Sequence, residues 1–393
     1  MKYGVIAHAT TMNFGDDVQT YAAKKQLPKV DYYLTRESLD TFESENGEAV
    51  GVIMNAWWLW RKWHWPPAQS IYPLLISMHI NNYNHWRKSS PIETQWLDSI
   101  GGDYFRAYGP VGSRDNTTIE FFEKNGIETY FSGCMTLTLP KQKSTPDAGS
   151  YVCLVDLKPE LEKKARELLK DSGLEIRTFT HHCDYRNLDI SMEERMNKVE
   201  EVLAQYQNAK FVITRRLHVA LPCLALEAPV LTIVNLDDVG NYTRWAPYSD
   251  WVYCTSESDF LSGDFEYDFA NPPLNKADYM DTRNALINRV KDFVEEISSN
   301  TLSADKLKKI KYTEDEERAW RYNLMQWTLD TWLHKSRGIL DERNMYKKET
   351  ATLKKKIQTL RNKNETLKKD IVNLNEEKRT LKKIIHELTG LSD

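Results

Sequence analysis

The sequence predicts an α/β fold with two Rossmann-like domains, followed by a C-terminal α-helical coiled coil. Three observations indicate this class. Short apolar runs alternate with amphipathic stretches in residues 1–140, the alternation restarts after a polar spacer at 141–150, and a leucine recurs every seven residues near the C-terminus. Strands that alternate with helices favour parallel βαβ units and doubly wound sheets.

The composition excludes several classes of protein. The chain has 393 residues, of which 41% are hydrophobic, so it can form two or three domains with sizeable cores. Its net charge of -4 indicates neither a nucleic-acid-binding protein nor a disordered acidic chain. The five cysteines are scattered and include no C-x-x-C pair, which indicates a reducing compartment and argues against a zinc site or a disulfide framework.

The sequence also predicts a cytoplasmic protein. The N-terminal stretch MKYGVIAHATT is too short in its apolar part for a signal peptide and is expected to form the first strand. No run approaches the ~20 apolar residues that a membrane-spanning helix needs.

In the first predicted domain, residues 1–140, apolar runs mark the strands and an amphipathic pattern marks the helix. The predicted strands cover residues 2–9, 50–55, 74–79, 104–108 and 128–130, and the predicted helix covers residues 16–26. The second predicted domain is 151–300 and is expected to carry the donor-binding motif. Its predicted strands cover 151–156, 175–180, 209–214 and 230–234, and its helices cover 160–172, 191–207 and 218–227.

Two such domains in tandem place a cleft between them. The cleft is expected to be lined by the carboxyl ends of strands and the N-termini of helices, where open α/β sheets bind ligands. A further amphipathic helix at 280–298 could pack on either domain.

The C-terminal region is predicted as a helical linker at 301–342 and a coiled coil at 343–390. The recurring leucines are Leu353, Leu360, Leu367, Leu374, Leu381 and Leu388, and the alternate core positions hold Ile357, Asn364, Ile371, Lys378 and Ile385. Leucine at one core position, isoleucine at the other and one buried asparagine favour a parallel two-stranded coil and so an oligomer, for which a homo-oligomer is expected. The flanking charges leave the partner open, because Glu349 can attract Lys354 of a partner helix whereas Lys356 would repel Arg361.

Three strand-to-helix junctions carry residues suited to anion binding and proton transfer. At Thr214-Arg215-Arg216-Leu217-His218, Arg216 offers a fork for a carboxylate or phosphate, and His218 can exchange a proton at neutral pH. Both side chains can point into one crevice beside a helix N-terminus. The alternative is that the arginines form salt bridges with carboxylates between the domains.

The other two junctions lie in the first domain. In Asn13-Phe14-Gly15-Asp16-Asp17, Gly15 permits close backbone approach and either aspartate can cap the following helix, so a plain capping turn is the alternative. In Gly112-Ser113-Arg114-Asp115, Arg114 is another candidate ligand for an anion.

A tryptophan cluster stands in IMNAWWLWRKWHWPP, residues 53–67. It suggests a loop packed on its own domain, a stacking platform for sugar rings, or a belt that touches a bilayer. His79, at the end of a predicted strand, could face the cleft or lie in the core. His181, His182 and Asp184 lack a fourth ligand at a sensible spacing, so no metal site is expected.

Taken together, these motifs resemble the polysaccharide pyruvyl transferase family over roughly residues 1–245. The resemblance is carried by NFGDDVQTYA, GSRDNTT, FSGCMTLTLP and TRRLHVALPCLALEAPV. It implies a GT-B-like arrangement of the two domains and transfer of the pyruvyl group of phosphoenolpyruvate to two hydroxyls of a sugar, in capsular, exo- or cell-wall polysaccharide biosynthesis. The tryptophan cluster departs from the family, since many relatives have a glycine-rich loop there.

The resemblance also implies roles for residues. The catalytic residues would be His218 and one of Asp16 and Asp17, with the choice between the aspartates open. The residues that bind phosphoenolpyruvate would be Arg216, Arg114, Asn13 and Gly15. The residues that bind the acceptor would be His79, Trp58, Trp60 and Arg244. No cofactor is expected beyond the donor substrate, and a lipid-linked acceptor would place the protein at the inner face of the membrane.

Two other functions fit parts of the pattern. A GT-B glycosyltransferase that uses a nucleotide-sugar would bind the diphosphate through Arg216, and fold alone does not separate the two activities. An inactive scaffold that works through its coiled coil is the third hypothesis. Arginine, histidine and aspartate at the three junctions argue against it.

Overall fold

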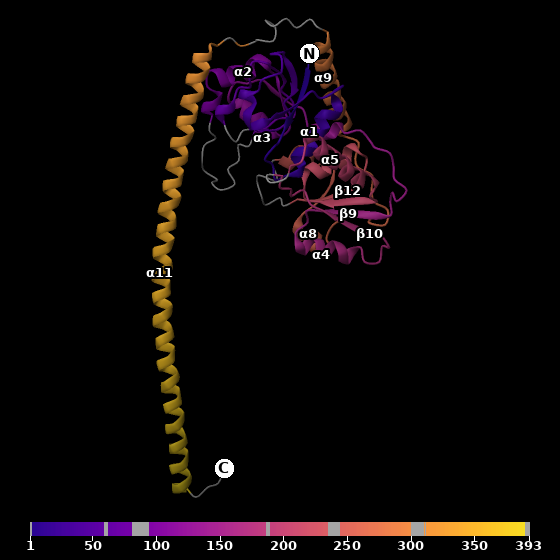
Figure 1. Cartoon of the computed structure of the whole chain (residues 1–393). Helices are drawn as coiled ribbons and strands as arrows, with labels where there is room; N and C mark the ends of the chain where they lie inside the picture. The colour runs from indigo at the N-terminus through magenta and orange to yellow at the C-terminus, as the bar shows by residue number, and fades with distance from the viewer. Residues whose placement is uncertain are drawn as a thin grey trace. The chain divides into compact units, whose positions relative to one another are not determined.

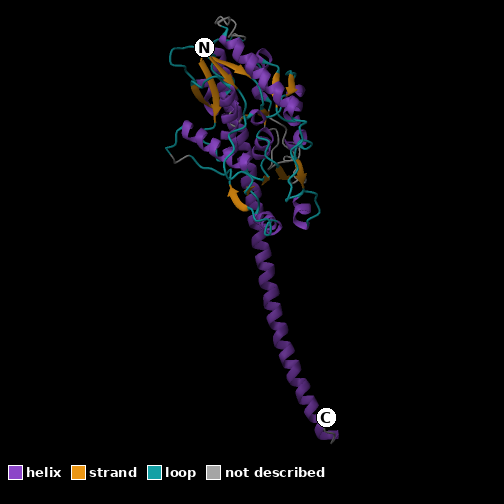
Figure 2. Cartoon of the chain, turned by 90° about the vertical axis from the view of Figure 1, so that its right-hand side faces the viewer, coloured by secondary structure: helices purple, strands orange, loops and turns teal. Residues whose placement is uncertain are grey.

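The computed structural model describes residues 2–58, 62–80, 94–185, 189–234, 244–299, 310 and 312–389. The chain divides into two compact units, Met1–Leu324 and Met325–Asp393. In the described residues, all strands belong to the first unit, and the second unit is helical (Figures 1 and 2).

The N-terminal half of the first unit, residues 2–140, is built on a parallel sheet. Its strands run in the order β2-β1-β3-β5, and each pairs in parallel with its neighbour. Beyond the end of β5, Gly112 N donates to Leu75 O at 2.9 Å and so links this sheet to the separate parallel pair β7–β8. The strands are β1 Lys2–Ala7, β2 Tyr32–Thr35, β3 Val50–Ile53, β4 Trp57–Trp58, β5 Ile71–Leu74, β6 His79–Ile80, β7 Val111–Ser113 and β8 Thr129–Phe131.

The C-terminal half, residues 151–255, repeats this plan. Its five parallel strands run in the order β10-β9-β11-β12-β13. They are β9 Tyr151–Val155, β10 Glu175–Phe179, β11 Phe211–Thr214, β12 Val230–Ile233 and β13 Tyr253–Thr255. Strands β9, β10 and β12 of this sheet are labelled in Figure 1. The central strands β9, β11 and β12 are fully buried, as expected for a parallel sheet covered on both faces. The predicted α/β class with parallel sheets is therefore confirmed.

Short helices connect the strands, and local capping fixes where several begin. The helices are α1 Phe14–Gln26, α2 Ile100–Tyr108, α3 Asn116–Lys124, α4 Pro159–Leu168, α5 Met192–Asn208, α6 Leu217–Ala225, α8 Glu257–Ser262 and α9 Met280–Ser298, and the 3-10 turns are η1 Arg36–Thr41, η2 Lys62–His64, η3 Gln95–Leu97, η4 Met135–Thr138 and η5 Ala246–Tyr248. Asn13 caps α1 by accepting from Gly15 N at 3.2 Å, and Asp115 caps α3 by accepting from Thr118 N at 3.0 Å. Both caps hold residues of the predicted motifs at the carboxyl ends of strands.

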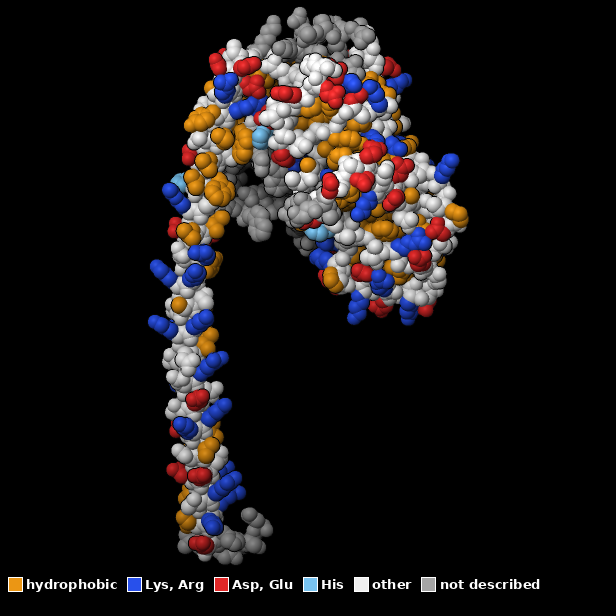
Figure 3. Space-filling view, viewed as in Figure 1, with side chains coloured by type: hydrophobic (Ala, Val, Ile, Leu, Met, Phe, Trp, Pro, Cys, Tyr) orange, Lys and Arg blue, Asp and Glu red, His pale blue; other side chains and the backbone are white. Residues whose placement is uncertain are grey.

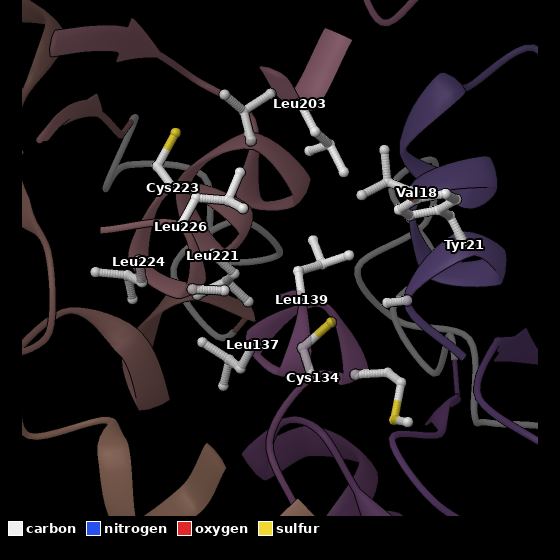
Figure 4. Packing of buried hydrophobic residues seen from close by; sticks show 14 of the residues in the cluster. Val18, Tyr21, Cys134, Leu137, Leu139, Leu203, Leu221, Cys223, Leu224 and Leu226 are labelled. Carbon is white, nitrogen blue, oxygen red and sulfur yellow. The ribbon is translucent and has the colours of Figure 1, made fainter. Parts of the chain in front are cut away.

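An apolar layer joins the two halves. It packs α1 and η4 from the first half against α5 and α6 from the second, and Val18, Leu139, Leu203 and Leu221 lie close together in it (Figure 4). One buried cluster thereby spans both sheets. Beside it, Arg195 on α5 forms a buried ion pair with Asp17 on α1.

Helix α9 packs on the N-terminal sheet, which resolves the alternative left open by the sequence. Phe293 stacks on Tyr72 of β5 with ring centroids 5.9 Å apart. Ile297 reaches Gly51 so closely that a Cβ at position 51 would lie 2.1 Å from its Cδ1. The chain therefore returns to the first sheet after it has built the second.

Helix α11, Glu314–Thr389, begins in the first unit and forms the second. Its first turns dock through Arg321, which donates to Trp63 O and Pro66 O at 2.7 Å. From Met325 onward it is one continuous helix with apolar side chains along its surface (Figure 3). The long helix of the predicted C-terminal region is confirmed, and its pairing into a coiled coil stays a prediction.

Residues 104–108, predicted as a strand, are helical in α2. Aromatic residues suggested a strand, but Ile100, Tyr104, Phe105 and Tyr108 follow a helical spacing, and the first three are buried. The strand of this region is β7. Strands β2 and β13 were not predicted, because neither shows a long apolar run.

Candidate active site

The three predicted junctions meet between the halves. Gly15, at the start of α1, lies against His218, at the start of α6, so that a Cβ at position 15 would be 3.0 Å from both Cβ and Nδ1 of the imidazole. The lack of a side chain at Gly15 therefore permits this approach. Arg114, at the end of β7, completes the group, with Nη1 3.4 Å from His218 Nε2.

Arg114 is a buried cation without a carboxylate partner in the described part of the chain. Arg114 is only 3% exposed, and its Nη1 donates to Gln19 Oε1. Its backbone is held on both sides, because Arg114 N donates to Met78 O at 3.0 Å and Tyr248 Oη donates to Arg114 O. A charge left buried in this way favours an anionic ligand.

His218 is neutral in this arrangement. Burial lowers its pKa well below the ordinary value, and repulsion from Arg114, Arg244, His181 and His79 lowers it further. A guanidinium only donates hydrogen bonds, so His218 Nε2 accepts at the contact with Arg114 and the ring proton belongs on Nδ1.

The half-buried Arg244 and the buried His79 also lie near His218. Burial lowers the pKa of Arg244, with repulsion from Arg114 as the next cause, and Arg244 Nε has no hydrogen-bond partner among the described residues. His79 Nδ1 contacts Asp115 Oδ2 at 2.5 Å. Burial would raise the pKa of Asp115, but His79 and Thr117 together hold it well below its usual range. Arg244 therefore brings a second cation to the site, and the His79–Asp115 pair forms part of its wall.

The structure separates the two aspartates that the sequence left open. Asp17 Oδ2 accepts from Arg195 Nε at 3.1 Å, and burial raises the pKa of Asp17 although Arg195 opposes the shift. Asp16 Oδ2 instead accepts from Thr11 Oγ1 at 2.6 Å, and Asp16 lines a pocket. Asp17 joins α1 to α5, whereas Asp16 faces space for a ligand.

The pocket has a volume of about 720 Å³ and lies at the carboxyl ends of β1 and β2. Besides Asp16, its lining includes Thr11, Arg36, His182 and Arg216. This is room for one or two sugar rings.

Both arginines after β11 already have partners. Arg216 Nε donates to Asp156 Oδ2 at 2.8 Å and its side chain is 45% exposed, while Arg215 Nη2 donates to Glu257 Oε1 at 2.7 Å. Salt bridges were the alternative for these residues, although both carboxylates come from the same half. Arg216 and His218 therefore do not share one environment, since His218 lies buried against Arg114.

Trp58 belongs to the core. It is 1% exposed and its ring lies 5.7 Å from that of Trp65, which in turn stacks on Phe105 at 4.5 Å. A side chain with so little exposure offers no face to a sugar or a bilayer in this structure, which argues against the acceptor role expected for Trp58. Trp60 lies outside the described residues.

Sequence reasoning missed Gln19 and Asp156. Gln19 lies one helical turn after Asp16 on α1, a spacing that places both on one face and could have drawn notice. Asp156 follows directly after β9, at a strand end like those of the three junctions. Among the described residues, no group of three or more histidine, cysteine, aspartate or glutamate side chains is placed to hold a metal ion. In the same part of the chain, no helix is both long and apolar enough to cross a membrane.

A family comparison matches the region that contains all three junctions. The family described as polysaccharide pyruvyl transferase matches residues 13–238, more than half of the chain. No curated protein matches the sequence.

Several solved structures are similar at low identity. An uncharacterized protein from Klebsiella pneumoniae is 16% identical, with 63% of this chain and 88% of that chain covered and a TM-score of 0.39. A UDP-GlcNAc 2-epimerase from Methanocaldococcus jannaschii is 11% identical, with 76% and 100% covered and a TM-score of 0.37. An E. coli heptosyltransferase with ADP-2-deoxy-2-fluoro heptose is 15% identical, with 76% and 100% covered and a TM-score of 0.28. The GT-B-like arrangement stays a prediction.

Proposed function

Because the chain belongs to the polysaccharide pyruvyl transferase family, we propose that it transfers the pyruvyl group of phosphoenolpyruvate to two hydroxyls of one sugar. The products are a cyclic ketal and phosphate. The observation that carries the proposal is Arg114, a buried guanidinium without a carboxylate partner among the described residues, in contact with His218 and inside the matched region.

The donor has two anionic groups, a carboxylate and a phosphate, and we assign one arginine to each, the buried Arg114 and the half-buried Arg244. Arg114 lies close enough to Arg244 that its charge adds to burial in lowering the pKa of Arg244, and an anion between the two would relieve this repulsion. Arg244 thus goes with the donor rather than with the acceptor. Gly15 and Asn13 contribute through the N-terminus of α1, whose backbone dipoles favour negative charge.

In the first step, one sugar hydroxyl attacks C2 of the donor. Asp16 accepts the hydroxyl proton, and a protonated His218 delivers a proton to C3, which becomes a methyl group. His218 is neutral before the donor binds. The negative charge of phosphoenolpyruvate raises the pKa of the imidazole, so donor binding itself prepares the acid.

In the second step, the other hydroxyl attacks the same carbon and its proton passes to the departing phosphate. The bond between C2 and the bridging oxygen breaks, hydrogen phosphate leaves with the electron pair, and the ring of the ketal closes. Arg114 and Arg244 stabilise the charge that develops on the departing phosphate.

Phosphate release from phosphoenolpyruvate in the presence of mixed sugar acceptors tests the proposal. We expect release that depends on both substrates and a methyl signal of the ketal by NMR. A protein that binds a nucleotide-sugar and leaves phosphoenolpyruvate intact would instead be a glycosyltransferase. Arg166→Ala, a change at an exposed arginine of α4, serves as the matched control and should retain full turnover.

A further inference from the structure

The apolar seam of α11 begins well before the predicted coiled coil. Counting back from Leu353 in steps of seven gives Tyr346, Ile339, Trp332 and Met325, all large and apolar. The seam therefore starts at Met325, the first residue after the first compact unit, and crosses the whole of the region predicted as a linker.

These side chains are exposed in the single chain. Exposures along the seam range from 41% at Met325 to 66% at Leu360. An uninterrupted apolar column of this length on an otherwise charged helix marks a surface that a second helix covers. The alternate column contains Asn364, Lys378 and Arg343, which disfavour assemblies that would bury them more deeply than a dimer does.

The charges beside the seam select the orientation. The position that follows each seam residue holds only basic or uncharged residues between 347 and 382, namely Lys347, Lys354, Arg361, Lys368, Asn375 and Lys382. In an antiparallel pair these columns face each other and repel. In a parallel pair, three of these residues face a glutamate of the partner helix, namely Glu342, Glu349 or Glu377. Two others face a lysine of the partner helix, Lys356 or Lys363, and repel it.

We propose that α11 pairs with α11 of a second copy of this chain as a parallel, in-register, two-stranded coiled coil from Met325 to Leu388. The occupant is a second copy because extending the seam adds the pair of Glu342 with Lys347, so that attractive pairs between two copies outnumber the repulsive ones. The coil joins both catalytic units at the same end, directly after their last docked turn.

Light scattering of the full chain tests the pairing. We expect twice the chain mass of 45.9 kDa. Leu360→Glu with Leu367→Glu should give the single mass, while the control Asn362→Glu with Thr366→Glu, on the outer face, should keep the double mass. A single mass for the wild type overturns the proposal, and sedimentation of that monomer with anionic liposomes would name a membrane as the occupant. A trimer or tetramer overturns the two-stranded form.

Cysteine cross-linking tests the orientation. Thr350→Cys and Ile385→Cys should each form a disulfide-linked dimer under mild oxidation, because parallel in-register pairing places each position opposite itself. Lys369→Cys, on the outer face, should not exceed the background of wild type. An antiparallel pair would cross-link neither Thr350→Cys nor Ile385→Cys and would overturn the orientation.

Gln19 links the two sides of the site, because its side chain is hydrogen-bonded to both Asp16 and Arg114. Gln19 is 1% exposed, and its Nε2 donates to Asp16 Oδ1 at 3.3 Å while its Oε1 accepts from Arg114 Nη1. A guanidinium only donates and a carboxylate only accepts, so the amide can have just one orientation. Its backbone is fixed as well, since Asn55 Nδ2 donates to Gln19 O at 3.0 Å.

On the basis of the proposed function, we infer that Gln19 is a positioning residue that holds Arg114 for the donor and Asp16 for the acceptor hydroxyl. A neutral amide suits this place. A carboxylate there would pair with Arg114, remove the free charge that the donor needs, and repel Asp16.

Gln19→Glu tests the inference. Affinity for phosphoenolpyruvate should fall at least about 10-fold, and the acid limb of the pH–rate profile should move to higher pH. Gln95→Glu, at an exposed position, should match wild type in both measurements. If wild type neither binds the donor nor releases phosphate, the proposed function fails.

The positioning role of Gln19 can be tested on the free protein even if the wild type does not bind the donor. His218 is faced by Arg114, Arg244, His181 and His79. Neutralising Arg114 should raise the pKa of His218 in Gln19→Glu, as seen by NMR of labelled histidine with His218→Gln to identify the signal. A His218 titration equal in wild type and Gln19→Glu overturns the inference.

Discussion

The arginine after β7 and the two arginines after β11 occupy equivalent places at strand ends but differ in their partners. Arg114 is buried against an amide and an imidazole. Arg215 and Arg216 are more exposed and each forms an ion pair with a carboxylate. An arginine at a strand end is therefore poised for an anion only when the protein leaves its charge without a carboxylate.

The largest expected effect concerns His218, which is two residues from Arg216 yet shares the buried surroundings of Arg114. His218→Ala should lower turnover about 1,000-fold because the proton for C3 is lost, with donor affinity nearly unchanged. Phosphate release and calorimetry measure the two quantities. His334→Ala, at an exposed position of α11, is the control, and near-normal turnover in His218→Ala would remove the assigned role.

The next effect concerns Arg114 itself. Arg114→Met keeps much of the side-chain volume and removes the charge, so affinity for phosphoenolpyruvate should fall about 100-fold. Calorimetry checks this against Arg166→Met, which should bind as wild type does. Unchanged affinity in Arg114→Met would make its buried charge purely structural.

Lowering the pH distinguishes the buried histidines from the exposed junction without any mutation. Burial lowers the pKa of His8 and of His181 to about 4, so the unfolded chain binds more protons than the folded chain between about pH 6.5 and about pH 4. Stability should therefore fall as the pH drops through this window, by about 2 kcal/mol for each histidine at about pH 5.

The exposed junction should not contribute to this loss. Burial raises the pKa of Asp156, but hydrogen bonds from His181 N and Thr180 and the charge of Arg216 lower it overall. The ion pair of Asp156 with Arg216 should therefore persist in this pH window. Urea unfolding at several pH values checks the slope, and His181→Gln should reduce it. A stability that stays level from about pH 7 to about pH 5 would contradict buried neutral imidazoles.

The smallest effect is expected at Arg216. Arg216→Ala should weaken donor binding less than about 10-fold, because the guanidinium must leave Asp156 before it can hold an anion. Calorimetry of phosphoenolpyruvate binding measures this change in affinity. A loss as large as that in Arg114→Met would mean that the two junctions act as one donor site.

The sequence predicted the parallel fold well where one pattern dominated. Apolar runs marked β9, β11 and β12, and an amphipathic pattern gave α9 its bounds. Patterns failed where two signals competed, as at Tyr104 and Phe105, whose aromatic rings suit a strand but lie on the buried face of α2. Trp58 was ambiguous for a similar reason, because composition does not reveal which face of a residue is covered.

The site was predicted in its parts rather than in its pairings. Motif reasoning found Gly15, Arg114 and His218, and the structure brings them together. It did not find that Asp17 is committed to Arg195 or Arg216 to Asp156, because both partners are distant in sequence. Long-range pairing depends on tertiary packing, which a single sequence pattern does not contain.

The apolar layer between the halves (Figure 4) bears on how such a protein can be altered. A chain cut within residues 141–150 would expose Leu139 on one fragment and Leu221 on the other, so neither fragment would be a soluble module by itself. The same holds for a chimaera that takes one half from a relative, since the layer would no longer interdigitate. The two halves must therefore be engineered as a matched pair.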